Sequence, residues 1–465
     1  MFSTTTYKNR REKLKKTVAS GLILLFGNEE SSMNYPDNHY HFRQDSNFLY
    51  FFGIDRPGLN GLIDIDKDQT IIFGDELTIE DIVWTGPQTS LKEMAARVGV
   101  MKVESQNSIV TYLKKAKKKG QQIHFLPPYR PENKLKLSDW IGIPVKGILN
   151  LVSIPLVKAI IGLAAKKEAV EIKEMEKAVN ISRQMHIAAM EYAKAGMTEA
   201  EVTGKVHGIA VSSGGNLSYP IILTVNGQTL HNHYHGNILK DGQLLLGDFG
   251  AETDLHYAGD ITRTFPVSSS FSTRQKEIYQ IVLDANTTCI NACQPGVPYR
   301  DVHLLAAKIK TEGLKALGIM KGDTEEAVHV GAHALFFPHG LGHMIGLDVH
   351  DMEDLGEDLV GYSDTIRRSP QFGLRSLRLG RMLEPGFTLT VEPGLYFIPE
   401  LIDLWEKEQK FSAFINYENL KAYRDFGGIR IEDNILITQT GQRILGDPIP
   451  KTVKEIEDIR QRVIS

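Results

Sequence analysis

The feature that most constrains this fold is a set of acidic residues placed within strand-like apolar runs. Asp248 follows a leucine run, Glu392 follows Leu-Thr-Val, and Glu432 interrupts an isoleucine-rich stretch. Asp260 opens a fourth run that alternates polar and apolar residues. A buried carboxylate is costly unless it is paired or bound to a cation. A neighbouring arginine or lysine could satisfy any one of these acids, but four in the same context favour a shared metal centre.

Length and composition indicate a soluble protein of more than one domain. The chain has 465 residues, and domains of ~100–200 residues predict two or three units. Hydrophobic residues make up 42% and charged residues 24% of the chain, which excludes collagen, coiled coil and extensive disorder. The net charge of −4 provides no cationic field for nucleic acid.

The first 165 residues have the pattern of a small α/β unit. Strand-like runs at 22–26, 49–52, 62–65 and 70–73 alternate with helix-compatible stretches. The basic segment before the first run indicates a helix that leads into a buried strand, rather than a signal peptide. The apolar region 141–165 is broken by prolines and lysines, so we expect no membrane span and a cytoplasmic location.

A second unit is expected from residue 166 to 465. Apolar residues at helical spacing predict a helix that ends before Gly196, and Thr198 with Glu201 predicts a capping box for the next helix. Helices are also expected near 273–291 and 301–317. Strands are expected at 244–248, 260–265, 388–392 and 429–437, which together predict an α+β fold with a mostly antiparallel sheet. Cys289 and Cys293 are expected to pack in a helix rather than to perform redox chemistry.

The histidines fall into two groups. One lies in a polar tract that could be an ordinary loop, and the other lies in a glycine-rich segment that favours a turn wrapped around a ligand. Any single histidine could instead be a satisfied core residue, but the second group together favours a functional site. The groups are His231, His233 and His235, and His339, His343 and His350.

Carboxylates with one histidine form a hard ligand set. Such a set suits divalent manganese, cobalt, iron or zinc rather than a thiolate zinc finger. Four acids could neutralise two cations, and two metals about 3.5–4 Å apart can share a nucleophilic hydroxide and bind a substrate oxygen. This chemistry predicts hydrolysis of an amide or a phosphoester.

The ordered motifs closely resemble those of the proline-specific peptidases of the pita-bread fold, aminopeptidase P and prolidase. The resemblance covers the chain after about residue 165 and is less sharp in the N-terminal part, through 42–48 and 81–86. It implies a pita-bread catalytic domain over 166–465 and a smaller α/β creatinase-like domain over 1–165. The motifs are Gly247–Gly250, Ala258–Pro266, His339–His343 with Val349–Asp351, Val391–Gly394 and Gly428–Asp433.

The resemblance also implies the roles of particular residues. Two divalent metal ions, Mn²⁺ above all with Co or Zn as alternatives, would be bridged by Asp260 and Glu432. One of these ions would also be bound by Asp248, and the other by His343 and Glu392. The further residues implied at the site are His231, His339 and His350, with Arg430 on the same strand face as Glu432. The segment from Asp248 to Asp260 is one residue longer than the common pattern, which a bulge or a longer hairpin turn would absorb.

The implied reaction is attack of a metal-bridging hydroxide on the carbonyl before proline. His350 and one metal would stabilise the oxyanion, and Glu392 would transfer the proton to the leaving nitrogen. Arg378 lies in a loop that resembles the prolidase version, where an arginine binds the C-terminal carboxylate of a dipeptide. It could instead be a solvated cation.

Several alternatives stay open from the sequence. We favour an Xaa-Pro dipeptidase over an Xaa-Pro aminopeptidase that acts on longer peptides. Methionine aminopeptidase shares the ligands but lacks the large N-terminal domain, and a non-catalytic pita-bread binding protein would usually have lost ligands. The expected partners are small peptides with proline in the second position and further copies of the chain in a homodimer or homotetramer, with no nucleic acid or membrane.

Overall fold

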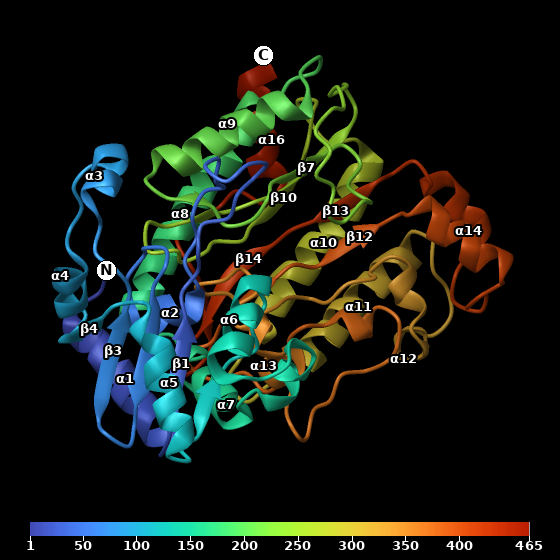
Figure 1. The fold of residues 1–465 in the computed structure, drawn as a ribbon. Helices are drawn as coiled ribbons and strands as arrows, with labels where there is room; N and C mark the ends of the chain where they lie inside the picture. Colours follow the sequence, from blue (N-terminus) through green and yellow to red (C-terminus); the bar gives the residue numbers. More distant parts are fainter. Residues whose placement is uncertain (465) are drawn as a thin grey trace. The chain divides into compact units, whose positions relative to one another are not determined.

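The computed structural model describes residues 1–464, which divide into two compact units (Figure 1). The first unit comprises Met1–Ala164 with Asp354–Gly356, and the second comprises Ala165–Glu353 and the chain from Glu357 onward. Each unit contains buried apolar residues of its own, so each is described by itself.

The first unit is built on a mixed sheet in the order β4-β3-β2-β1-β5. The pairs β1–β2 and β2–β3 are antiparallel, whereas β4 pairs with β3 and β5 pairs with β1 in parallel. The predicted α/β character of this unit is therefore confirmed. The strands are β1 (Leu22–Phe26), β2 (Asn60–Asp64), β3 (Gln69–Phe73), β4 (Lys102–Glu104) and β5 (Ile123–Phe125).

One predicted strand of this unit is wrong, because residues 49–52 belong to helix α2 (Ser46–Phe52). The Asp45 carboxylate accepts a hydrogen bond from the Phe48 N–H at 2.8 Å and caps the helix. Gly53, with φ +60°, ends it in the left-handed conformation. The helix is buried along its apolar residues, so its sequence lacks the polar face that would have indicated a helical period.

The other helices of this unit lie before, between and after these strands along the chain. Helix α1 leads directly into β1, as predicted. Among residues 1–464 no single helix is long and apolar enough to cross a membrane, while η1 and α7 form one pair, bent by 60°, that meets the length and composition criterion together. The elements are α1 (Thr4–Val18), α3 (Ile79–Thr85), α4 (Leu91–Arg97), α5 (Ser108–Lys118), α6 (Pro131–Ile141), η1 (Val145–Leu151) and α7 (Ile154–Ala164).

The strands of the second unit pair in the antiparallel sense, as predicted. They form the arrangements β10-β8-β7, β11-β14-β15, β12-β13 and β6-β9. The strands are β6 (Asn216–Leu217), β7 (Ile222–Thr224), β8 (Leu244–Asp248), β9 (Ala251–Glu252), β10 (Thr262–Pro266), β11 (Thr388–Val391), β12 (Gly394–Tyr396), β13 (Gly428–Arg430), β14 (Asp433–Ile437) and β15 (Gln442–Ile444).

Helices lie between these strands, which makes the unit α+β. The predicted helix before Gly196 is α8, and Thr198 and Glu201 form the predicted capping box of α9. The α-helices are α8 (Ala169–Tyr192), α9 (Glu199–Ser212), α10 (Thr273–Ala292), α11 (Tyr299–Ala316), α12 (Thr324–Val330), α13 (Glu357–Gly361), α14 (Pro399–Lys407), α15 (Tyr417–Leu420) and α16 (Val453–Ile464). Short 3₁₀ turns include η2 (Ala332–Leu335), η4 (Leu374–Ser376) and η5 (Lys421–Tyr423). A further turn, η3 (Glu353–Leu355), begins in this unit, and its last two residues are assigned to the first unit.

The predicted strand at 429–437 is broken in two. Strand β13 pairs with β12, whereas β14 pairs with β11, and Glu432 lies at the break. The alternation survives the break, because Ile429 and Ile431 enter the apolar core of the unit while Arg430 and Glu432 make polar contacts. The break thus places a carboxylate where two strand pairs meet.

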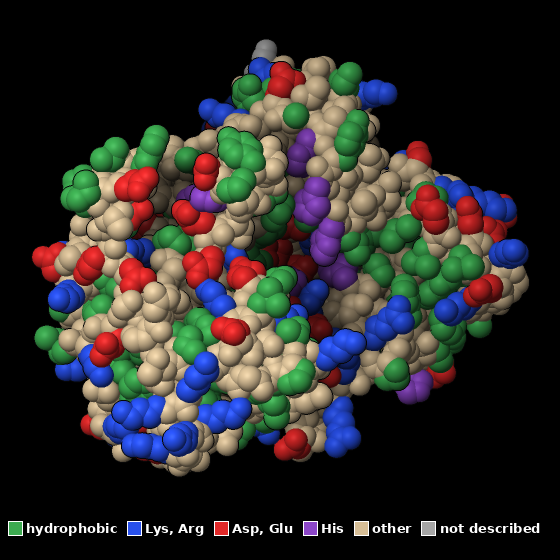
Figure 2. Space-filling view, viewed as in Figure 1, with side chains coloured by type: hydrophobic (Ala, Val, Ile, Leu, Met, Phe, Trp, Pro, Cys, Tyr) green, Lys and Arg blue, Asp and Glu red, His purple; other side chains and the backbone are tan. Residues whose placement is uncertain are grey.

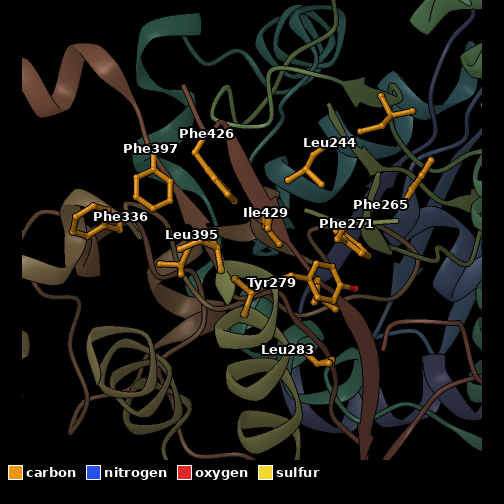
Figure 3. Packing of buried hydrophobic residues seen from close by; sticks show 14 of the residues in the cluster. Leu244, Phe265, Phe271, Tyr279, Leu283, Phe336, Leu395, Phe397, Phe426 and Ile429 are labelled. Carbon is orange, nitrogen blue, oxygen red and sulfur yellow. The ribbon is translucent and has the colours of Figure 1, made fainter. Parts of the chain in front are cut away.

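The apolar core of the second unit lies against these strands. Figure 3 shows Tyr279 and Leu283 of α10 packed near Ile429 of β13, with Leu395 and Phe397 close by. Both cysteines are buried free thiols within or just after α10, which agrees with a packing role.

Asn286 of α10 holds the two strand ends beside this break. Its Nδ2 donates to the carbonyls of Val391 and Ile431 at 3.0 and 3.3 Å, and its Oδ1 accepts from Lys451 Nζ at 2.8 Å. Because a polar side chain with no solvent exposure fixes both carbonyls, it positions the residues that follow them.

We predict that Asn286→Ala lowers the free energy of unfolding by roughly 2–3 kcal/mol, because it leaves buried polar groups without partners. Urea denaturation followed by circular dichroism measures the loss. The exposed Asn419 supplies the matched control, since Asn419→Ala should cost less than about 0.5 kcal/mol. Equal losses in the two variants would contradict the anchoring role.

Candidate metal centre

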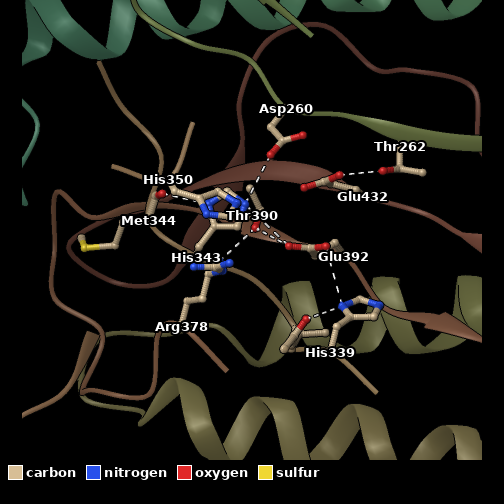
Figure 4. Close-up of polar contacts among 12 residues, drawn as sticks. Asp260, Thr262, His339, His343, Met344, His350, Arg378, Thr390, Glu392 and Glu432 are labelled. Atoms are coloured by element: carbon tan, nitrogen blue, oxygen red, sulfur yellow. Dashed lines mark hydrogen bonds and ion pairs between the residues drawn. The ribbon is translucent and has the colours of Figure 1, made fainter. Parts of the chain in front are cut away.

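The five residues implied as metal ligands line one cavity of the second unit. Figure 4 shows four of them, Asp260, His343, Glu392 and Glu432. Asp248 ends β8, Asp260 precedes β10, Glu392 follows β11, and Glu432 separates β13 from β14. In the β11–β14 register Val391 lies opposite Asp433, so Glu392 and Glu432 continue from neighbouring positions. Asn434 fixes the backbone of Asp260 from both sides, through bonds of 3.0 Å to its N–H and 2.6 Å to its carbonyl.

His343 is oriented by its own backbone. Its Nδ1 lies 2.9 Å from the Met344 carbonyl, which can only accept, so Nδ1 carries a proton and acts as the donor. Its Nε2 therefore faces the acids, at 3.3 Å from Asp260 Oδ2 and 3.6 Å from Glu392 Oε1. A histidine held at one nitrogen by a carbonyl and directed by the other at carboxylates has the usual arrangement of a metal ligand.

The donor set fits divalent cations. Asp260, His343 and Glu432 each offer an atom, and the three atoms lie within 4.8 Å of one another. Glu432 Oε2 accepts from the Thr262 hydroxyl at 2.7 Å, whereas its buried Oε1 has no hydrogen-bond partner among residues 1–464. A buried carboxylate oxygen without a donor requires a proton or a cation.

The pKa shifts show how strongly the acids repel one another. Burial, and then the neighbouring carboxylates, hold the pKa of Glu432 well above its usual range. Burial raises the pKa of Glu392 to about 7 against the opposing charge of His343. Burial acts to lower the pKa of His343, but Asp260 and Glu392 raise it to about 9. The protein without metal therefore retains protons where cations would otherwise balance the charge.

Tyr219, which the sequence did not reveal, lies between two of these acids. Its hydroxyl is 2.6 Å from Asp248 Oδ1 and 2.5 Å from Asp260 Oδ1. One hydroxyl proton cannot serve two ionised oxygens, so a further proton or a cation must lie between these acids. A lone tyrosine before Pro220 gave no signal, since its partners are far along the chain.

A second polar chain joins Asp248 to His339. Arg430 Nη2 donates to Asp248 Oδ2 at 2.5 Å and its Nη1 donates to the Tyr396 hydroxyl at 2.8 Å. That hydroxyl lies 2.9 Å from His339 Nε2, and His339 Nδ1 lies 2.7 Å from the Gly340 carbonyl. Both nitrogens of His339 thus contact protein groups, and Tyr396 is a second residue that the sequence did not reveal.

Two adjoining cavities open onto these residues. One of about 240 Å³ is lined by His231, His339, His350 and Arg378, and one of about 420 Å³ is lined by His231, His233 and His350. Figure 2 shows histidine side chains gathered beside a hollow that contains acidic and basic side chains. His231 lines both cavities, whereas His235 Nε2 contacts the Ile221 carbonyl at 3.1 Å. Position therefore favours His231 among the three.

The hairpin between Asp248 and Asp260 turns at residues 253–257. The Thr253 N–H donates to the Tyr257 carbonyl at 3.0 Å, and His256 adopts φ +65° within the turn. Both acids line the same cavity, and the extra residue relative to the common pattern stays a prediction.

Comparison with known proteins finds a family model that matches each unit. Residues 173–439 match the model of metallopeptidase family M24, and residues 7–124 match the aminopeptidase P N-terminal domain. The chain is 33% identical to an Xaa-Pro dipeptidase of Rattus norvegicus over 459 residues, which covers 96% of this chain and 90% of the rat protein. It is 34% identical to a probable Xaa-Pro aminopeptidase of Sordaria macrospora, covering 96% of this chain and 92% of the fungal protein.

A solved structure supports the same relationship. Zinc-substituted E. coli aminopeptidase P in complex with product has a TM-score of 0.81 at 29% identity, covering 99% of both chains. The fold and the buried cluster of acids and histidine define a metal-dependent hydrolase. The chain belongs to metallopeptidase family M24, among its proline-specific members of the pita-bread fold, as the motifs predicted. The non-catalytic alternative is thereby set aside.

We predict that divalent metal binding releases protons and strengthens as pH rises from 6 to 8. His343, Glu392 and Glu432 have raised pKa values without metal, and a ligand must lose its proton to bind. Each displaced proton should raise the apparent affinity about tenfold per pH unit, with the rise levelling off above about pH 9, where His343 is already neutral.

Isothermal titration of Mn²⁺ in buffers of different ionisation enthalpy counts the protons. His333, whose pKa is lowered by burial to about 4, is neutral throughout this range and does not titrate, so the His333→Asn variant should release the same number of protons. An affinity that stays flat between pH 6 and 8 would contradict the prediction.

Proposed function

We propose that this metallopeptidase is an Xaa-Pro dipeptidase, which cleaves the peptide bond before proline in a dipeptide. The observation that supports dipeptides is Arg378, whose guanidinium lines the same cavity as His339, His350 and Glu392. An arginine can bind a carboxylate through two parallel hydrogen bonds. A positive group in a small cavity suits a substrate whose C-terminal carboxylate lies one residue beyond the bond that is cleaved.

The metal would be held by the five residues already described. Asp248, Asp260, His343, Glu392 and Glu432 would bind two divalent ions, with Mn²⁺ as the first candidate and Co or Zn as alternatives. When bound, such ions polarise a substrate carbonyl and lower the pKa of water toward neutrality. Arg430 would continue to balance Asp248, because it contacts the oxygen that Tyr219 does not.

Side chains that line the cavities would orient the substrate and transfer a proton to its leaving nitrogen. His350 Nδ1 lies 3.1 Å from Glu353 Oε2, which leaves Nε2 for a substrate in the cavities that it lines. Glu392 borders both cavities, so it is placed to transfer a proton to the leaving proline nitrogen. Tyr396 and Arg430 would fix the ring of His339 against the substrate.

An Xaa-Pro aminopeptidase is the alternative, and one observation favours it. Arg378 is ion-paired with Glu353 and Glu357 and its side chain is 38% exposed. A cation already neutralised in this way would exclude longer peptides less strictly. The printed names of the relatives include both activities. Manganese, a homodimer or homotetramer and a cytoplasmic location stay predictions.

The direct test compares Ala-Pro with Ala-Pro-Ala, first with Mn²⁺ and then with a chelator. Turnover of the dipeptide alone supports the dipeptidase. Turnover of the tripeptide as well supports the aminopeptidase. No chelator-sensitive activity on either substrate would overturn the Xaa-Pro proposal.

We predict that Arg378→Met raises KM for Ala-Pro by about tenfold to a hundredfold, which is the usual effect of losing a charge-assisted hydrogen bond. KM for Ala-Pro amide, which has no carboxylate, should change much less. The control is Arg375→Met, three residues away on the exposed surface of the same loop. An equal loss for the acid and the amide would assign Arg378 to loop structure instead.

A further inference from the structure

A single carboxylate lies between a histidine and an arginine of the substrate cavity. Glu353 Oε2 is 2.6 Å from Arg378 Nη1 and 3.1 Å from His350 Nδ1. Its side chain is only 18% exposed, so water screens these contacts less than it would on an open surface. Figure 4 shows Arg378 and His350 on the same side of the acid cluster.

The charges around Arg378 sum to an excess of negative charge. Its Nη1 also lies 3.3 Å from Glu357 Oε1. Arg368 then pairs with Glu357 at 3.2 Å and with Asp358 at 2.7 Å. Two guanidinium groups therefore face three carboxylates, and Arg378 offers an incoming carboxylate less attraction than an unpaired arginine would.

Glu353 is ionised in this arrangement. Burial acts to raise its pKa, but the hydrogen bond with His350 and the charge of Arg378 lower it below the usual range. The Nε and Nη2 of Arg378 have no hydrogen-bond partner among residues 1–464. A substrate carboxylate bound there would share one guanidinium with Glu353 and be repelled by it.

We propose that Glu353 is a specificity-determining residue that competes with the substrate carboxylate for Arg378 and so limits the preference for dipeptides. This inference rests on the proposed function, in which Arg378 receives that carboxylate. Glu353 thus already makes the ion pair with Arg378 that the C-terminal carboxylate of a dipeptide would make. Substrates that lack a carboxylate at this position gain nothing when the competitor is removed.

The test uses Glu353→Gln, which removes the charge and keeps an oxygen that can accept from His350 Nδ1. The readout is kcat/KM for Ala-Pro divided by kcat/KM for Ala-Pro amide, because this ratio cancels any effect that acts through His350 on both substrates. We expect the ratio to rise about threefold to tenfold, the range for a partly exposed ion pair. In an Arg378→Met background the same substitution should produce no rise.

Glu384→Gln is the matched control. Glu384 also pairs with a loop arginine, Arg381 at 3.0 Å, and with Lys166 at 2.8 Å, and its side chain is 35% exposed. It does not line either cavity. In Glu384→Gln, the ratio of kcat/KM for Ala-Pro to kcat/KM for Ala-Pro amide should equal that of the unmodified protein. A ratio in Glu353→Gln that is unchanged or lower would overturn the proposal, because Glu353 would then only hold Arg378 in place. If that variant does not fold, Glu353→Asp, which shortens the side chain away from Nη1, should give a smaller rise.

Calorimetry separates failure of this inference from failure of the proposed function. Proline and prolinamide differ in the carboxylate alone, and their binding to the Mn²⁺-loaded protein does not require turnover. Glu353→Gln should tighten proline binding about threefold to tenfold relative to prolinamide. Tighter proline binding in a protein with no peptidase activity would overturn the proposed dipeptidase function but support competition by Glu353. Dipeptidase activity without tighter proline binding would support the proposed function but overturn competition by Glu353.

Discussion

The catalytic unit depends on the repulsion among four carboxylates, of which three are buried and the fourth, Glu392, is 18% exposed. Asp248, Asp260, Glu392 and Glu432 approach one another where little water reaches them, and burial with mutual repulsion raises three of their pKa values. Only Asp260 has a lowered pKa, because His343 opposes the effect of burial on it. Arg430 balances Asp248, but the remaining charge requires protons or cations, which is why the site suits divalent metals.

The surrounding fold holds these charges in place against their repulsion. The acids stand at strand ends and at a strand break, where the backbone is fixed by buried amides such as Asn286 and Asn434. Hydroxyl groups from Tyr219 and Thr262 supply donors to oxygens that the backbone does not reach. A rigid frame of this kind pre-organises ligands so that metal binding requires little rearrangement.

The relatives of this chain include an Xaa-Pro dipeptidase and a probable Xaa-Pro aminopeptidase. Under the proposed function, the choice between these activities would depend on a network of ion pairs at the edge of the cavity. Arg378 would supply a positive group for a dipeptide, while its ion pairs with Glu353 and Glu357 would reduce the charge that a substrate meets. Glu353 also contacts His350, so recognition of the carboxylate and orientation of the His350 ring would share one side chain. Selectivity can therefore change without any change in the metal ligands.

The sequence alone predicted the candidate ligands and identified the family, because acids in apolar runs and glycine-rich histidine motifs are local patterns. It also predicted half of the strands of the catalytic unit, namely β8, β10, β11, β13 and β14. The sequence-based prediction was wrong at 49–52, because the cap at Asp45 and the end at Gly53 define a helix whose residues from Phe48 onward are all apolar. The contacts of Tyr219, Tyr396 and Glu353 were decided only by the tertiary structure. Each of them joins residues from separate segments of the chain, as in the bond from Tyr219 to Asp260 across 41 positions, and no local pattern of spacing or hydrophobicity records such a contact.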